Sequence, residues 1–231
     1  MSIIANTQHP ETALTGLQVA FSKPFILASA SSRRRDILRA AGFDFIIEVS
    51  NAEPDSAGPA DARLQQALDD DAAVRFALNA ARAKALDVAA ANPYRLIVAA
   101  DTVVLVGNEL LGKPADPADA ARMLRALSGK ANSVTTAIAI ACAENRDPTV
   151  LLQDHETSRV IFAELTQQQI DDYVRTGEPL DKAGAYAVQG LGAALIQRVE
   201  GSFLNVVGLP ITKLCDMLQQ LGYPVPPHHN N

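Results

Sequence analysis

The sequence predicts a mixed α/β fold, an elongated twisted sheet flanked by helices, and three segments carry this prediction. The run "RLIVAAD" at 95–101 is continuously apolar, as expected of a central strand that is buried on both faces. "SVTTAIAIAC" at 133–142 alternates strictly and "ETSRVIFAEL" follows at 156–165, which predicts a long antiparallel pair. An Ala-rich stretch from about 63 to 91 predicts a long helix. Strands of both crossover and hairpin type indicate a mixed sheet.

Turn and cap residues place the remaining elements. "FILAS" at 25–29 predicts a first strand, and the helix after it reaches about residue 41, where Gly42 can end it. "FDFIIEV" is typical of a second strand, and "TVVLVGNELLGKP" predicts a strand, a tight turn at Gly107–Asn108 and a return strand. Asp116 is expected to cap the next helix, with Pro117 in its first position.

The C-terminal third is expected to be more irregular. Thr166 and Gln169 have the spacing of a capping box, which predicts a helix to about residue 176. The Gly-rich stretch 176–194 predicts irregular backbone, and "ALIQRV" predicts a strand. A last helix is expected over about 206–221.

Composition and charge exclude several classes of protein. The chain has 231 residues and a formal net charge of −6, which argues against non-specific nucleic-acid binding. Its two cysteines, far apart in apolar surroundings, suit a reducing cytoplasm. No apolar run approaches the roughly 20 residues of a membrane span. We therefore expect a cytoplasmic protein with one two-lobed domain at 24–222, between a flexible extension at 1–23 and a flexible tail at 223–231.

The stretch "ILASASSRRRDIL" at 26–38 can bind phosphate for a physical reason. A strand that runs into a helix leaves backbone N–H groups unpaired at the helix start. The hydroxyls of Ser29 and Ser31 add donors, and the guanidinium groups of Arg33 and Arg34 bind phosphate oxygens in pairs. The competing interpretation is that Ser32 is an ordinary N-cap and that the arginines are solvated. The residues alone leave both open.

Further candidates lie later in the chain. Asp101 ends the apolar run at 95–101, and a carboxylate there can hold a divalent cation or accept a proton from water. The competing interpretation is that it caps a turn through Thr102, although the apolar run before it favours a functional role. Lys113, in "LGKP", lies one hairpin away, and for Glu53 and Lys84 a solvated charge is the competing interpretation.

The stretch "GEPLDKAGAYAVQG" places charged side chains, and Gln189, beside glycines. Glycine permits close approach of the backbone to a ligand, although such a loop can also be a structural crossover.

Together, "SASSRR", "ADTVV", "LGKP" and "GEPLDKAGAYAVQG…GSFLNVVGLPI" resemble the Maf family of nucleoside triphosphate pyrophosphatases, from about residue 25 to 221. The family pattern Ser-x-Ser-Pro-Arg-Arg differs here only in that Ser32 replaces the proline. The resemblance implies an inosine-triphosphatase-like sheet with a central cleft, a divalent cation (Mg²⁺ or Mn²⁺), a nucleoside triphosphate substrate and a possible homodimer.

The resemblance also implies roles for individual residues. Asp101 corresponds to the catalytic aspartate, treated as the proton acceptor. Three residues fall on positions tied to substrate choice: Arg33, Thr102 and Gln189. The residues that would handle phosphates are Ser29, Ser31, Arg34, Lys84 and Lys113. Asp101 and Glu53 would hold the metal.

The last motif separates branches of that family. The branch that acts on 7-methyl-GTP carries a cysteine at the position of Lys182 and a glutamate at that of Gln189, so this sequence resembles the dTTP/UTP branch instead. Thymine and uracil offer an acceptor–donor–acceptor edge, which a Gln amide can both donate to and accept from. A glutamate would face carbonyl oxygens, which is a poor pairing.

The function implied is hydrolysis of dTTP and UTP, and of modified pyrimidine nucleotides as an extension, to the monophosphate and pyrophosphate. Two alternatives stay open. One is a nucleotide-binding regulator of cell division and septum formation without significant turnover, and the other is a 7-methyl-GTP pyrophosphatase.

Overall fold

The computed structural model of the protein describes residues 19–52 and 69–226. They form one seven-stranded sheet in the order β2-β1-β3-β5-β6-β7, with β4 paired to β3 beside this path. The strands are β1 Phe25–Leu27, β2 Phe45–Ile47, β3 Ile97–Val106, β4 Glu109–Leu111, β5 Ala131–Glu144, β6 Asp147–Phe162 and β7 Ile196–Glu200. The α-helices are α2 Ser32–Ala40, α3 Asp70–Ala91, α4 Pro117–Leu127, α5 Gln167–Arg175, α6 Phe203–Val207 and α7 Ile211–Gln220. Short 3₁₀ helices occupy η2 Glu178–Asp181, η3 Ala183–Ala185 and η4 Gly190–Leu195. The predicted mixed, elongated α/β sheet is confirmed.

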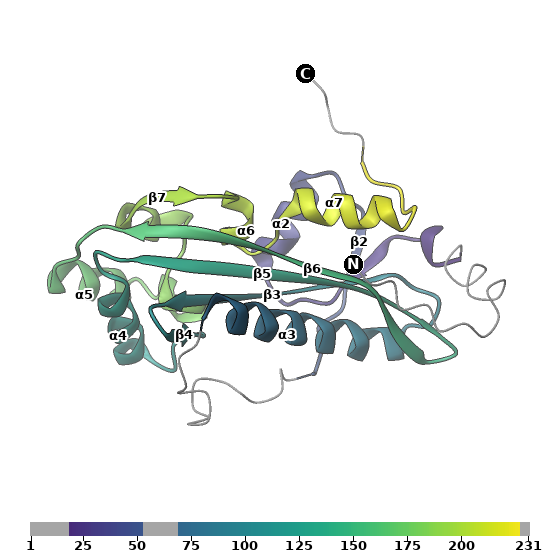
Figure 1. Ribbon diagram of the computed structural model, residues 1–231, viewed down its shortest axis with the longest axis horizontal. Coiled ribbons are helices and arrows are strands. Elements are labelled where there is room, and N and C mark those ends of the chain that lie inside the picture. Colours follow the sequence, from purple (N-terminus) through teal and green to yellow (C-terminus); the bar gives the residue numbers. More distant parts are fainter. Residues whose placement is uncertain (1–18, 53–68, 227–231) are drawn as a thin grey trace, which may run out of the picture.

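Helices cover both faces of the sheet (Figure 1). The long helix α3 runs along one face, and its alanines pack on small side chains of β3 and β5, so the helix can approach the sheet closely. Helices α2, α6 and α7 cover the other face through a larger Leu, Val and Phe cluster. Helices α4 and α5 close one end of the molecule. None of the helices in the described ranges is long and apolar enough to cross a membrane.

The predicted antiparallel pair exists and is longer than the sequence suggested. Strands β5 and β6 pair from Ala131↔Ile161 to Glu144↔Asp147. The turn between them places Asn145 and Arg146 at positive φ (47° and 70°), the conformation that two-residue hairpins favour. The capping box of Thr166 with Gln169 is also confirmed, as is the cap of α4 by Asp116.

The predicted end of the central strand at Asp101 is wrong. Strand β3 continues through Asp101 to Val106, because Asp101 and Thr102 pair with Ala137 and Thr136 of β5 as part of a continuous ladder. A polar side chain in mid-strand is tolerated here because its side of the strand is not fully covered, as described below.

The predicted last helix is present as α7, but it begins at Ile211 rather than at about 206, because the chain breaks between α6 and α7. Gly208 between them has a φ of 126°, which L side chains rarely adopt. Pro210 follows and has no N–H for a continuing helix. At this break the carbonyl oxygen of Gly208 accepts a hydrogen bond from Nε of Arg34.

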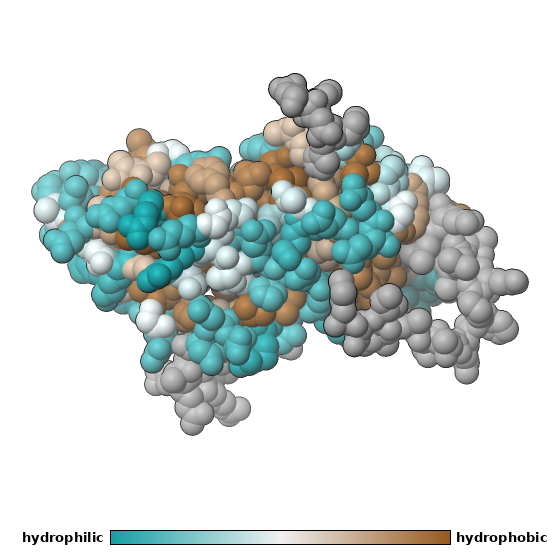
Figure 2. Space-filling model, turned by 45° about the horizontal axis from the view of Figure 1, so that its top comes forward, coloured by the Kyte–Doolittle hydropathy of each residue, from teal (hydrophilic) through white to brown (hydrophobic). Residues whose placement is uncertain are grey.

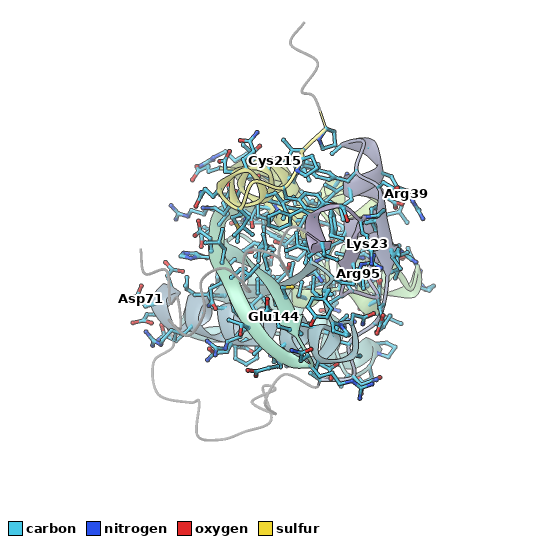
Figure 3. The ribbon with its side chains drawn as sticks, turned by 90° about the vertical axis from the view of Figure 1, so that its right-hand side faces the viewer. Lys23, Arg39, Asp71, Arg95, Glu144 and Cys215 are labelled. Atoms are coloured by element: carbon cyan, nitrogen blue, oxygen red, sulfur yellow. The ribbon has the colours of Figure 1, made fainter. Side chains whose placement is uncertain are left out.

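The two ends of the described chain meet at one end of the sheet. Tyr223, the first residue of the expected tail, is buried, and its hydroxyl donates to Lys23 O (3.1 Å) and accepts from Phe25 N (3.2 Å). Arg95 donates to Pro24 O (2.6 Å), and Figure 3 shows Arg95 beside Lys23 at this end. The packed structure therefore includes Tyr223, and 227–231 lie outside the described residues.

Candidate functional site

The site lies at a stretch of β3 that one neighbouring strand leaves uncovered. One edge of β3 pairs with β5 from Ile97 to Leu105. On the other edge β1 pairs only at 97–98 and β4 only at 104–106. Among the described strands none pairs with 99–103 on that side, so the backbone edge at Asp101 and Thr102 has no strand beside it.

The serine–arginine segment lies directly across from this uncovered edge, because the chain leaves β1 at Leu27 and enters α2 at Ser32. Ser31, rather than Ser32, is the N-cap, and its hydroxyl accepts from Arg34 N at 3.5 Å. The interpretation with Ser32 as the cap is therefore wrong. Ser32 is the first helical residue, a position where proline is common, so its replacement of the family's proline leaves the helix start intact.

Arg34 is the centre of this half of the site. Its Nη1 donates to Ser29 Oγ (3.0 Å), its Nη2 to Thr102 Oγ1 (3.1 Å) and its Nε to Gly208 O (2.8 Å). Burial lowers the pKa of Arg34, and the nearby carboxylate of Asp101 opposes that shift. A guanidinium has five N–H groups. Three are bonded here, which leaves two for a ligand.

The hydrogen bonds around Arg34 continue into the core, and the donor and acceptor of each bond can be assigned. Thr136 Oγ1 donates its only proton to Asn205 O (2.9 Å), so in the contact between the Thr102 and Thr136 hydroxyls (2.8 Å) Thr102 is the donor. Thr102 therefore accepts from Arg34 and donates to Thr136. Asn205 is fully buried, accepts from Thr136 N (3.2 Å), and donates to Val134 O and Ser158 Oγ (both 2.9 Å).

Sequence reasoning missed Thr136 and Asn205 as members of the site. The signal for Asn205 was a lone amide inside the apolar stretch "FLNVVG". A buried amide needs several partners, so it marks a hydrogen-bond network. Thr136 carried no signal, because its alternating strand is full of similar threonines and alanines.

Asp101 lies on the opposite face of the sheet from Thr102, because successive side chains of a strand alternate. Its Oδ1 accepts from Nζ of Lys84 on α3 at 2.5 Å. Both side chains are mostly buried, with 23% of Lys84 and 17% of Asp101 exposed. The structure therefore places Lys84 against Asp101 rather than in solvent. The signal was its spacing from Ala77, Ala81 and Val88, which puts a lysine on the apolar face of the helix.

Because the uncovered edge of β3 has no described strand beside it at 99–103, side chains from both faces of the sheet border one site. Asp101 borders that edge from one face of the sheet and Arg34 from the other, and the two are close enough for Asp101 to affect the pKa of Arg34. The site combines one carboxylate with several fixed cations, which suits a polyanionic ligand.

Arg33 connects α2 to the Gly-rich segment. Its Nη1 lies 3.3 Å from Oδ2 of Asp181, whose Oδ1 accepts from Lys182 Nζ at 2.5 Å. Burial raises the pKa of Asp181, but the hydrogen bond and charge of Lys182 and the charge of Arg33 outweigh it and lower the pKa overall. Arg33 is thus held by a carboxylate that is itself largely exposed, so a more highly charged anion can compete for it.

Lys113 and the Gly-rich segment border the same region. Gly184 donates to Gly112 O (3.0 Å) and lies against Val104, two residues beyond Thr102 in β3. Lys113 is exposed next to this contact. Gln189 is exposed too, and its side chain makes no hydrogen bond to any other residue of the described ranges. Direct contacts therefore join Ser29, Ser31, Arg34 and Thr102 in one group and Lys84 with Asp101 in a second, and Asp101 and Thr102 are adjacent residues of β3. Arg33 contacts Asp181, and Lys113 and Gln189 lie on neighbouring loops.

The donor set fits a metal that arrives with its substrate better than a metal held by the protein alone. No cluster of three or more His, Cys, Asp or Glu side chains within 19–52 and 69–226 has the arrangement of a metal site. Asp101 offers one carboxylate whose Oδ2 accepts no hydrogen bond from the residues described. Mg²⁺ is commonly bound by one or two carboxylates together with substrate phosphates. Glu53, the second expected ligand, lies outside the described residues.

Comparison with known proteins identifies the family. A family model described as "Maf-like protein" matches residues 24–221. A protein of Symbiobacterium thermophilum named dTTP/UTP pyrophosphatase is 40% identical over 87% of this chain and 95% of its own. One of the same name from Pelotomaculum thermopropionicum is 42% identical over 88% of this chain and 99% of its own. A solved HAM1 protein from Coxiella burnetii aligns with 85% of this chain and 98% of its own, at 17% identity and a TM-score of 0.45, a likeness too low to support an argument.

Proposed function

The chain belongs to the Maf family, and we propose that it hydrolyses dTTP and UTP to the nucleoside monophosphate and pyrophosphate. The observation that carries the proposal is the presentation of Asp101 and Arg34 from opposite faces at one uncovered edge of β3. The names of the relatives support the choice of nucleotide.

In this proposal the triphosphate lies across the start of α2. The two unused N–H groups of Arg34 bind phosphate oxygens, and Arg33 exchanges its exposed partner Asp181 for phosphate. Lys113 binds from the neighbouring loop. Because Arg34 is already fixed by three bonds, it needs no reorganisation when negative charge develops in the transition state.

Asp101 is proposed to be the general base. A water oxygen attacks the α-phosphorus, its proton passes to Asp101, and the bond from the α-phosphorus to the bridging oxygen breaks, so that pyrophosphate leaves. Lys84 orients the carboxylate by holding Oδ1, which leaves Oδ2 to face the water or a metal. Mg²⁺ or Mn²⁺ would be held by Asp101, together with Glu53, and would offset phosphate charge.

The base is proposed to be read by Gln189, whose amide matches the edge of thymine or uracil. Lys182 and Gln189 together favour the dTTP/UTP branch over 7-methyl-GTP. Thr102 would influence the substrate through Arg34, which it contacts, and Arg33 through the phosphates.

Pyrophosphate release from a panel of normal and modified nucleoside triphosphates, with and without Mg²⁺ or Mn²⁺, tests this function. We expect the highest kcat/KM for dTTP and UTP. Asp101→Asn should lower turnover by about 10²-fold or more, because the amide cannot accept the proton. Near-normal turnover by this variant would show that Asp101 is not the base.

The same assay separates the alternatives. A regulatory protein that only binds nucleotide would saturate with dTTP and release no pyrophosphate. A preference for 7-methyl-GTP would contradict the assignment of Gln189.

A cytoplasmic location and a homodimer belong to the proposal as well. Both cysteines are buried and free, as suits a reducing compartment. Analytical ultracentrifugation of the purified chain tests the dimer.

A further inference from the structure

The loop that carries Gln189 is closed by a single carboxylate. Glu178, at the start of η2, accepts from Leu191 N through Oε1 (3.1 Å) and from Gly192 N through Oε2 (2.9 Å). These bonds tie the beginning of the segment to the two residues that follow Gln189 and Gly190. The backbone just after Gln189 is therefore fixed by Glu178.

The backbone just before Gln189 is fixed by two tyrosines. Tyr173 Oη accepts from Ala187 N (3.1 Å), and Tyr186 Oη donates to Asn132 Oδ1 (3.0 Å) in the buried end of β5. The Tyr186 ring packs edge-on against Phe162 at 4.8 Å between ring centroids. Gln189 is thus an exposed side chain between two anchored stretches of backbone.

Two glycines make this closure sterically possible. A Cβ on Gly190 would lie 2.3 Å from Oε1 of Glu178, and Gly190 has a φ of 81°. A Cβ on Gly192 would lie 2.5 Å from both Ala187 O and Tyr173 Oη. Any other residue at either position would displace the bonds around Glu178 and Tyr173.

Glu178 is charged when it makes these bonds. Burial raises its pKa, but the hydroxyl of Tyr173, the two backbone N–H groups and the charge of Lys182 outweigh burial and lower the pKa overall. Both carboxylate oxygens therefore act as acceptors at neutral pH, which an amide at this position could not reproduce.

We propose that Glu178 is a positioning residue for base selection: it touches no substrate, but fixes Gln189 in the orientation that distinguishes uracil and thymine from cytosine. The inference rests on the proposed function, because it assumes that Gln189 faces the base. In Glu178→Gln an amide N–H₂ faces a backbone N–H, so one of the two bonds is lost and Gln189 can take several orientations.

The test measures binding rather than turnover. The α,β-methylene analogues of UTP and CTP are titrated calorimetrically into the full-length protein, and the ratio of their Kd values is the selectivity. We expect wild type to prefer the UTP analogue and Glu178→Gln to reduce that preference about tenfold. Asp172→Asn is the matched control, because Asp172 bonds only to Gln168 and Arg175 on its own helix, and it should leave the ratio unchanged.

A double-mutant cycle separates positioning from general damage. In a Gln189→Ala background, Glu178→Gln should no longer change the ratio, because its effect passes through the Gln189 side chain. Tyr173→Phe removes the hydroxyl that accepts from Ala187 N but keeps the ring, and it should act in the same direction if Glu178→Gln does not fold. An unchanged ratio in both variants, an equal effect with Ala at 189, or a wild-type protein that does not discriminate the analogues would overturn the inference. UTP hydrolysis by wild type is measured in parallel, since binding without pyrophosphate release defeats the proposed function alone.

Discussion

On the side of the site that is proposed to bind phosphate, Arg34 is bonded to groups from three separate segments, and the chain of bonds behind it ends in the fully buried Asn205. On the side that is proposed to bind the base, Gln189 is exposed, and only the backbone around it is fixed by hydrogen bonds. The difference matches the two tasks. Phosphates are common to all substrates and require fixed, desolvated donors, whereas the base differs between substrates.

This division separates specificity from stability. A side chain that has no partners in the core can be exchanged without leaving a buried group unsatisfied. If Gln189 reads the base as proposed, a substitution at position 189 can change base preference without disturbing the bonds around Arg34. Figure 2 shows the surface on the side of α6 and α7, where hydrophobic side chains are visible.

The largest effect is expected from Arg34→Lys. A lysine has one ammonium on a flexible stem and cannot reach Ser29 Oγ, Thr102 Oγ1 and Gly208 O together. We expect kcat/KM for dTTP to fall by about 10²–10³-fold, as measured by pyrophosphate release.

The neighbouring Arg35→Lys is the control for that variant. Arg35 makes no side-chain hydrogen bond or ion pair to the described residues and is expected to be a surface charge. Its substitution should change kcat/KM by less than about twofold. If both variants were equally active, the rigid phosphate side would have no catalytic importance.

A smaller effect on activity, but a large one on stability, is expected from Asn205→Ala. The substitution removes the partners of Thr136 N and Val134 O in a buried place. The free energy of unfolding, measured by urea denaturation, should fall by about 2–4 kcal/mol. Turnover should fall by about tenfold, because the backbone of residue 205, whose carbonyl accepts from Thr136 Oγ1, loses the side-chain bonds that fix it against β5.

Asn108→Ala provides the comparison for stability, since Asn108 is an exposed residue of the turn between β3 and β4. It should change the free energy of unfolding by less than about 0.5 kcal/mol. A similarly small change for Asn205→Ala would mean that the network is not what holds Arg34.

The sequence predicts features that depend on residues close together in the chain better than features that depend on residues far apart in it. The hairpin of β5 and β6, the caps of α4 and α5 and the Ala-rich face of α3 depend on neighbouring residues, and a single sequence displays those patterns. The extension of β3 beyond Asp101 depends on its ladder with β5, which is formed by residues 28 to 34 positions away. Local composition alone indicates a strand end at Asp101, because a polar residue follows an apolar run there.

The site shows the same limit. Ser29, Ser31 and Arg34 were candidates because they lie in one short segment that begins a helix. The contact of Lys84 with Asp101, and the bond from Arg34 to the carbonyl of Gly208, join elements that only the tertiary fold brings together. Glu178 was only one of several charges in a Gly-rich stretch, because the amides that it binds follow thirteen and fourteen residues later.

The smallest effect on stability, and the most selective one on activity, is expected from Gln189→Glu. The side chain is exposed and makes no hydrogen bond to another described residue, so the free energy of unfolding should stay within about 0.5 kcal/mol of wild type. The carboxylate would face the carbonyl oxygens of thymine or uracil, so kcat/KM for dTTP and UTP should fall by about tenfold or more. Gln219→Glu, an exposed position on α7, adds the same charge away from the site and should leave both quantities unchanged. If Gln189→Glu lost more stability than Gln219→Glu, the separation of the two sides would be contradicted. Gln189 would then belong to the same packed structure as Arg34.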